Sequence, residues 1–240
     1  MGNNKERIRN FVKLVLGLAR CPICGDVETE MICGECEREL REEFLKRRKG
    51  RLCRYCGLPL ISEKEICCDC RVETESDRTL FFPEGTALFA YKGIAKEAVR
   101  VFKFKNERSF GVIFASFAAV LLENRRNSAV LVPVPGNRSN VRNRGWDPAA
   151  VIADALKEKG FRTAVLLERK RLTVSLKRLS REERLRRAVD CYRLRKGVVV
   201  PSHVILIDDV RTTGSTVNRC ARLLKEAGAE EVSFLVLAAA

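Results

Sequence analysis

The fold of this chain is decided by one stretch of sequence, VILIDDVRTTGST at residues 204–216. Its first four residues are apolar and predict a buried strand, which ends in two adjacent carboxylates, Asp208 and Asp209. A short loop rich in hydroxyl groups follows and opens a helix at Ser215. Hydroxyls, exposed amides and the positive end of a helix dipole form a cradle for a phosphate, and Gly214 lets the backbone approach it closely.

The two carboxylates have a different expected task from the loop. Because they are anions, Asp208 and Asp209 suit ribose hydroxyls, directly or through Mg²⁺, rather than the phosphate itself. A capped helix after a core strand would explain neither the acid pair nor the hydroxyls. The stretch therefore predicts a site for a phosphorylated ribose.

Strand and helix signals alternate along the chain from residue 86 onward. We expect strands at residues 86–91, 129–134, 163–167, 203–207 and 231–237, and helices at residues 95–104, 111–123, 148–159 and 215–227. This alternation predicts an α/β domain over residues 80–240, with a mainly parallel sheet and helices on both faces. Ligands of such sheets bind at the carboxyl ends of the strands, where the hydroxyl-rich loop is expected.

Nine of the eleven cysteines lie between residues 21 and 70. Eight of them form four Cys-x-x-Cys pairs, which are Cys21/Cys24, Cys33/Cys36, Cys53/Cys56 and Cys67/Cys70. A two-residue gap lets both thiolates of a tight turn reach one tetrahedral Zn²⁺. We therefore expect a double zinc ribbon over residues 21–75 with two structural zinc sites of four cysteines each. The simplest assignment gives the first two pairs to one ion and the last two to the other, although a crossed pairing fits the spacing too.

Three other uses of the cysteines compete with zinc. A reducing cytosol argues against disulfides, and four tandem pairs without a thioredoxin-like pattern favour metal over a redox motif. An iron–sulfur cluster stays open as an alternative. We expect the ribbon to have a core separate from that of the α/β domain.

The net charge of +15 is unevenly placed along the chain. Residues 1–75 hold 15 Lys and Arg against 14 Asp and Glu, whereas residues 76–240 hold 31 against 17. Any attraction for phosphate or nucleic acid is therefore expected on the second module. A solvated basic surface is the simpler alternative.

The first twenty residues resemble a secretion signal only in part. Lys13 interrupts their apolar run, no small-residue cleavage site follows, and no apolar run of the chain approaches the roughly 20 residues of a membrane span. We expect an amphipathic helix over residues 1–20, no membrane insertion, and a cytoplasmic protein.

The motifs in their order resemble the ComF family, the competence-protein-F-like proteins with a double zinc ribbon and a type I phosphoribosyltransferase domain. Residues 204–216 resemble the signature with which type I phosphoribosyltransferases bind 5-phosphoribosyl-1-pyrophosphate (PRPP). The other stretches that carry the resemblance are the cysteine pairs, Phe89–Gly93, Lys103–Lys105, Val132–Pro135, Arg142–Trp146 and Leu179–Arg184.

The resemblance implies PRPP with Mg²⁺ as ligands, and it implies a role for each matching residue. Asp208 and Asp209 would hold the ribose hydroxyls, and the 5-phosphate would lie on Thr212, Thr213, Gly214, Ser215 and Thr216. The turn 135–138, which ends in Arg138, takes the place of the pyrophosphate loop. The basic stretch 171–187 takes the place of a mobile loop, where Arg181 would screen the leaving pyrophosphate. Asp208, Asp209 and Arg181 are thus the expected catalytic residues.

The sequence departs from the family's usual pattern near the expected acceptor. Trp146-Asp147-Pro148 stands where an aromatic residue, Asn and Gln are usual, and Leu176, Arg178 and Arg187 replace usual Gln, Gly and Asn residues. These changes spare the phosphate cradle. They leave the second substrate open.

Three functions are compatible with this pattern. The first is an enzyme that transfers phosphoribosyl from PRPP to an unknown acceptor in a DNA-uptake context. The second is an accessory protein that binds single-stranded DNA and other DNA-uptake proteins, with PRPP binding as a sensor or relic. The third and weaker one is nucleobase salvage. His203, the single histidine, starts a buried strand and is expected to be structural.

Overall fold

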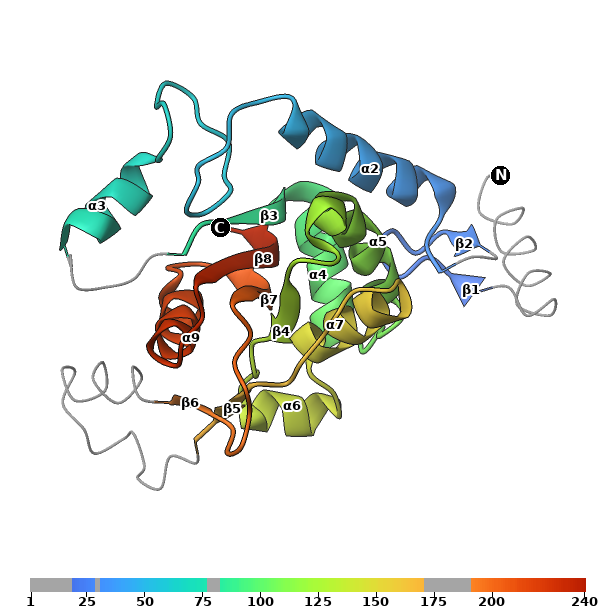
Figure 1. Cartoon of the computed structure of the whole chain (residues 1–240). Helices are drawn as coiled ribbons and strands as arrows, with labels where there is room; N and C mark the ends of the chain where they lie inside the picture. Colours follow the sequence, from blue (N-terminus) through green and yellow to red (C-terminus); the bar gives the residue numbers. More distant parts are fainter. Residues whose placement is uncertain (1–18, 29–30, 77–82, 171–190) are drawn as a thin grey trace, which may run out of the picture.

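The computed structural model describes four parts of the chain, which are residues 19–28, 31–76, 83–170 and 191–240 (Figure 1). The basic stretch 171–187, with Arg181, lies outside these parts. Most of the helix expected over residues 1–20 lies outside them too, and its last two residues form a short strand instead. Within the described parts, no helix has the length and apolar character that crossing a membrane requires.

A four-stranded parallel sheet forms the centre of the molecule. Its strands are, in spatial order, β3 (Gly85–Ala90), β8 (Glu231–Ala239), β7 (His203–Arg211) and β4 (Val130–Pro133). Both inner strands, β7 and β8, are apolar over most of their length, as expected where helices cover both faces. The predicted α/β class with a mainly parallel sheet is confirmed.

The two faces of this sheet are covered by different numbers of helices. One face, called the larger face for its larger core, packs against α4 (Gly93–Phe104), α5 (Phe110–Leu122) and α7 (Pro148–Glu158), and the other packs against α9 (Ser215–Glu226) (Figure 1). Side chains of β7 alternate between these cores. Ile205 and Ile207 face the three-helix side, whereas Leu206 faces α9.

The prediction of a strand at residues 163–167 is wrong in part. Thr163 makes a single parallel bridge to Leu131, and the chain then leaves the sheet. Regular pairing begins at Leu167, where β5 (Leu167–Arg169) runs antiparallel to β6 (Tyr192–Leu194). Leu166 and Leu167 are buried, but they pack in the α9 core beneath this ribbon rather than in the parallel sheet, and Val165 is exposed.

Two short helices complete the α/β part. The 3₁₀ helix η1 (Glu123–Arg125) extends α5, and α6 (Arg138–Arg144) follows β4. The helices expected from the sequence do not include α6, although common helix-capping residues stand at both of its ends. Asn137 caps it by accepting a hydrogen bond from the Ser139 N–H at 2.9 Å, and Gly145 ends it with φ of +83°.

The cysteine-rich part comprises two short strands and two helices. Strands β1 (Ala19–Arg20) and β2 (Val27–Glu28) pair antiparallel, and α2 (Gly34–Arg48) and α3 (Cys68–Ser76) follow. Figure 1 shows α2 lying across the three-helix side of the sheet, with β1 and β2 at one end and α3 beyond the other. The division into domains near residues 75–80 stays a prediction.

The expectation of two separate cores is wrong for the first cysteine pairs. Phe44 of α2 is buried, and its ring centroid lies 4.9 Å from that of Phe117 and 6.2 Å from that of Phe89. Cys33 and Cys36 belong to the same apolar cluster. The reason is the apolar side of α2, which needs a partner surface and finds it on α5 and β3.

Candidate functional site

The acid pair lies where β7 reaches the carboxyl edge of the sheet. Asp209 forms an ion pair with Lys103, with 2.8 Å between Oδ2 and Nζ, and both side chains are only 20% exposed. Asp208 Oδ1 accepts the Asp209 N–H at 2.8 Å, and Asp209 Oδ1 accepts the Val210 N–H at 2.6 Å. These bonds fix both carboxylates close to the backbone of the following loop.

Negative charge is concentrated at this edge. Burial raises the pKa of Asp208 well above its usual range, and the neighbouring charge of Asp209 raises it further. Burial also raises the pKa of Asp147, and the neighbouring charge of Asp209 raises this pKa too. Three carboxyl groups thus share a region in which Lys103 supplies a positive charge. A divalent cation would relieve their mutual repulsion.

The loop after the acid pair has the properties of a phosphate cradle. Gly214, with φ of +72°, is the N-cap of α9, so the first turn of a twelve-residue helix points its N–H groups at the loop. Thr212, Thr213 and Ser215 are exposed, and the hydroxyls of Thr213 and Ser215 lie 2.9 Å apart. The two hydroxyls are hydrogen-bonded to each other at the N-terminus of α9, where a helix favours an anion.

The turn after β4 lies beside the acid pair, because β4 and β7 are neighbours in the sheet. The Gly136 N–H donates to Asp147 Oδ2 at 2.7 Å, and a Cβ at Gly136 would come within 3.2 Å of both Asp147 oxygens. Asp147 also caps α7 by accepting the Ala149 N–H at 3.2 Å. Asp147 therefore ties this turn to the start of α7. Arg138 is exposed at the start of α6.

A cavity of about 450 Å³ lies between this turn, α6 and the β5–β6 ribbon. Its charged lining comprises Arg138, Arg142, Asp147, Glu168, Arg169 and Arg195. Four arginines against two acids make it a suitable place for an anionic or polar group next to the acid pair.

Several of these residues were missed from sequence. Lys103 stands in a quoted motif, yet no local pattern showed that it would reach Asp209. Its position follows from α6, because Arg144 Nε donates to the Lys103 carbonyl at 2.6 Å. Trp146, just after α6, makes a second link to the segment after α4, because its Nε1 donates to Asn106 Oδ1 at 2.5 Å. Arg169 could not be placed either, because the ribbon that carries it was not expected.

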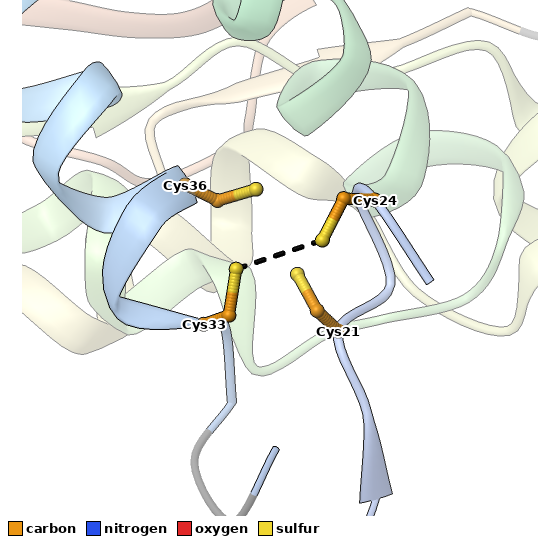
Figure 2. Close-up of side chains that lie close together, drawn as sticks. All are labelled: Cys21, Cys24, Cys33 and Cys36. Carbon is orange, nitrogen blue, oxygen red and sulfur yellow. Dashed lines mark hydrogen bonds between the residues drawn. The ribbon is translucent and has the colours of Figure 1, made fainter. Parts of the chain in front are cut away.

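The eight paired cysteines form two clusters. Their members are Cys21, Cys24, Cys33 and Cys36 in cluster 1, and Cys53, Cys56, Cys67 and Cys70 in cluster 2. All sulfurs of a cluster lie within 4.8 Å of one another, and Figure 2 shows those of cluster 1 pointing toward a common centre. The sulfurs are grouped as the sequential assignment expects, with the first two pairs in one cluster and the last two in the other.

The clusters have the geometry and chemistry of structural metal sites. Sulfurs bound to one Zn²⁺ at about 2.3 Å in a tetrahedron lie about 3.8 Å apart, close to the 3.7 Å between Cys56 and Cys67. In cluster 2 the Leu58 N–H and the Cys67 N–H each lie 3.4 Å from a cysteine sulfur. A hydrogen bond from Cys70 lowers the pKa of Cys56 to about 5, so a thiolate is already favoured there. The residues fit the ion.

Comparison with known proteins agrees with this geometry. The family model for the phosphoribosyl transferase domain matches residues 141–240. Competence protein ComFC of Streptococcus pneumoniae is 32% identical over 151 residues, which is 63% of this chain and 66% of that protein. The matched part thus spans just under two thirds of that relative. Competence protein ComFC of Bacillus subtilis is 27% identical over 214 residues, or 87% of this chain and 84% of its own.

Solved structures with similar folds are more distant. The allosteric regulatory enzyme of purine biosynthesis matches with a TM-score of 0.36 and 21% identity, over 53% of this chain and 26% of its own. A hypoxanthine phosphoribosyltransferase of Trypanosoma cruzi matches with a TM-score of 0.35 and 13% identity, over 55% of this chain and 66% of its own. From the family-model match, the two competence proteins and the paired cysteine clusters, we conclude that the chain has a type I phosphoribosyltransferase fold and is similar to the ComF family.

Proposed function

We propose that this protein binds PRPP with Mg²⁺ at the carboxyl edge of β7 and transfers the phosphoribosyl group to an acceptor. The single observation that carries the proposal is the placement of Asp208 and Asp209 between two anion-binding loops. The hydroxyl-rich loop at residues 212–216 lies on one side, and the turn at residues 135–138 follows the neighbouring strand.

Each part of PRPP has a partner of matching chemistry in this proposal. The 5-phosphate lies at the start of α9, and the ribose hydroxyls lie on Asp208 and Asp209. The pyrophosphate lies at the turn after β4, near Arg138. Mg²⁺ would neutralise the pyrophosphate oxygens and offset the carboxyl repulsion at this edge. Lys103 holds Asp209 in place through their ion pair.

The transfer step needs positioning and charge stabilisation more than acid–base chemistry. A lone pair of the acceptor forms the new bond to the anomeric carbon while the bond from that carbon to pyrophosphate breaks. Pyrophosphate leaves with the bonding electrons, and positive charge develops on the ribose ring. Asp209 and the bound anion stabilise that charge, and the arginine-lined cavity beside Asp147 has room for an acceptor.

We further propose that each cysteine cluster holds one structural Zn²⁺. Four thiolates complete a tetrahedral shell, so each ion has no open position for substrate. Reduced thiols persist in the cytoplasm, which is where we place the protein. Elemental analysis of the purified chain should return two zinc ions per chain. Iron with visible absorption would contradict the assignment.

The proposed binding is tested by calorimetric titration with PRPP and Mg²⁺. The double variant Asp208→Asn with Asp209→Asn should bind about tenfold to a hundredfold more weakly, because losing a charged hydrogen bond costs about 1.5–3 kcal/mol and Asn keeps one acceptor oxygen. Asp154→Asn, an exposed carboxyl on α7, is the matched control and should bind as wild type does. Wild-type protein that gives no heat with millimolar PRPP and Mg²⁺ would refute the proposal. A screen for pyrophosphate release against nucleobases, nucleotides and short DNA then seeks the acceptor.

A second candidate function is binding of single-stranded DNA during DNA uptake. It is favoured by the charge of residues 76–240, which hold 31 Lys and Arg against 17 Asp and Glu. The four arginines of the cavity add to it. Two relatives bear the name of competence proteins, and competence consists of taking up DNA. PRPP binding would then be a sensor or relic.

Salt dependence separates this candidate from the enzyme. The slope of log affinity against log salt concentration depends on how many Lys and Arg side chains contact DNA phosphates. Removing one such side chain should reduce the slope by about 0.7 for single strands. Reversal of Arg181, Arg184 and Arg187 to Glu tests the basic stretch, and reversal of Arg138 and Arg142 tests the cavity. DNA affinity without any PRPP-dependent pyrophosphate release would favour the binding protein.

A further inference from the structure

Arg211 is a charged residue inside the phosphate-site stretch, yet its side chain is turned away from solvent. It is the last residue of β7, and it is only 5% exposed. Its Nη2 donates a hydrogen bond to the sulfur of Cys70 at 3.8 Å. Cys70 belongs to cluster 2 and lies 141 positions earlier in the sequence. The contact therefore joins the proposed phosphate site to a cysteine cluster.

The same guanidinium also packs against the phosphate loop. A Cβ at Gly214 would come within 2.5 Å of Arg211 Nη2 and 2.8 Å of Cζ and Nε. The backbone of Gly214 thus lies directly against the guanidinium plane. A side chain at position 214 is excluded twice, by this contact and by the φ of +72°. The guanidinium fills the space between Cys70 and the backbone that forms the start of α9.

Cluster 2 is itself fixed to the sheet, so this contact joins two anchored parts. A Cβ at Gly57 would come within 2.6 Å of the Ala87 nitrogen, which shows that the cluster 2 turn packs directly on β3. The Gly85 N–H donates to the Arg54 carbonyl at 2.9 Å, and buried Arg47 donates to the Gly57 carbonyl. Cys70 is therefore held in a defined place relative to β7.

We propose that Arg211 is a positioning residue that couples cluster 2 to the phosphate loop. Four thiolates around one Zn²⁺ leave a net charge of about −2, and a buried guanidinium that donates to one of the sulfurs offsets part of it. Such partners of metal ligands fix the ligand and strengthen the metal site. Held in this way, the guanidinium keeps the backbone of residues 212–214 in the shape that receives a phosphate. This inference rests on the proposed PRPP site, whose phosphate loop Arg211 would support.

The coupling must act in both directions, because linkage between two binding equilibria is reciprocal. Zinc in cluster 2 strengthens PRPP binding, and PRPP with Mg²⁺ strengthens zinc binding in cluster 2, which we expect to appear as slower zinc loss. Cluster 1 should not respond in this way, because its cysteines pack in the core shared by α2 and α5. The proposal thus predicts an effect on one of two zinc ions.

The test uses the full zinc-loaded chain with Arg211→Met, Arg211→Lys and the control Arg222→Met. Arg222 is a partly exposed arginine of α9, paired with Glu226 at 2.7 Å. Zinc transfer to a chromogenic chelator should show two phases of one ion each. In Arg211→Met one phase should be about tenfold to a hundredfold faster, as for other partners of metal ligands that are removed. Arg211→Lys, which keeps the charge, should give a smaller change, and Arg222→Met none.

The other measurements separate this inference from the proposed function. Hydrogen exchange of the amides at residues 212–216 should be faster in Arg211→Met without any ligand. Calorimetry should show weaker PRPP binding with Mg²⁺, and saturating PRPP should slow one zinc phase in wild type but not in Arg211→Met. Wild-type zinc release and loop exchange in Arg211→Met would overturn the coupling even if PRPP binds. Wild-type protein that does not bind PRPP refutes the proposed function, while zinc release and loop exchange still decide the coupling. If Arg211→Met does not fold, Arg211→Lys decides by the same measurements.

Discussion

The two cysteine clusters have the same ligands but are attached to the molecule by different means. Cluster 1 shares its core with Phe44, Phe89 and the helices on the larger face of the sheet. Cluster 2 has a small core of its own, with Cys53, Cys56 and Cys70. Its links to the sheet are backbone hydrogen bonds, close glycine contacts and buried arginines. A four-cysteine site can thus serve overall stability or local geometry, depending on what surrounds it.

The largest expected difference between the clusters is in stability after loss of a ligand. Cys36→Ser in cluster 1 should destabilise the whole chain by more than about 4 kcal/mol, because loss of the metal also opens the shared core. Cys56→Ser in cluster 2 should leave the main unfolding transition closer to that of wild type. Cys68→Ser, an exposed cysteine outside both clusters, is the control. Denaturant unfolding followed by circular dichroism measures these effects, and equal losses in the two cluster variants would contradict the comparison.

The next effect concerns the packing that attaches cluster 1. Phe44→Ala should cost about 3–5 kcal/mol, because a buried ring between α5 and β3 is removed and a cavity remains. Leu45→Ala is the matched control, since Leu45 follows directly and is 53% exposed. Urea unfolding gives both values. A cost for Phe44→Ala no larger than that for Leu45→Ala would show that the core is not shared.

A smaller effect compares two glycines at equivalent places in the clusters. Gly25 and Gly57 each follow a cysteine pair and have φ of +85° and +69°. A Cβ at Gly25 would meet nothing within 4 Å, whereas one at Gly57 would meet the β3 backbone at 2.6 Å. Gly25→Ala should therefore cost only about 1 kcal/mol of backbone strain. Gly57→Ala should cost about 2–3 kcal/mol, because backbone must also move. Equal thermal midpoints would mean that cluster 2 is not fixed on β3.

The smallest effect lies at the acid pair, which precedes Arg211 on the same strand. The pKa of Asp208 is raised, so the folded chain binds more protons than the unfolded chain between the usual aspartate pKa and the raised value. Stability without ligand is therefore lost as pH rises through that window. Asp208→Asn should raise the midpoint at neutral pH by about 2–4 °C, the shift that about 1 kcal/mol produces in a chain of this size. It should also flatten the pH dependence. A lower midpoint would show that the ionised carboxylate stabilises the fold.

Much of the fold and part of the candidate site could be predicted from sequence. The strand before Asp208, the hydroxyl-rich loop and the cysteine pairs are local patterns, because spacing along the chain sets their geometry. What escaped prediction depends on contacts between distant segments. Lys103 reaches Asp209 only because α6 ties down the end of α4. No local pattern tells that Arg211, inside the clearest motif of the chain, turns toward Cys70.

The order of the strands has a consequence for how the protein is made. Strand β3, on which cluster 2 rests, pairs with β8, which is synthesised about 140 residues later. Until β8 emerges, the growing chain carries its cysteine pairs without the sheet that holds cluster 2. Such long-range pairing is slow, and unprotected thiols are open to oxidation in the meantime. We therefore expect the yield of correctly assembled protein to depend on the zinc supply during synthesis more than on zinc added afterwards.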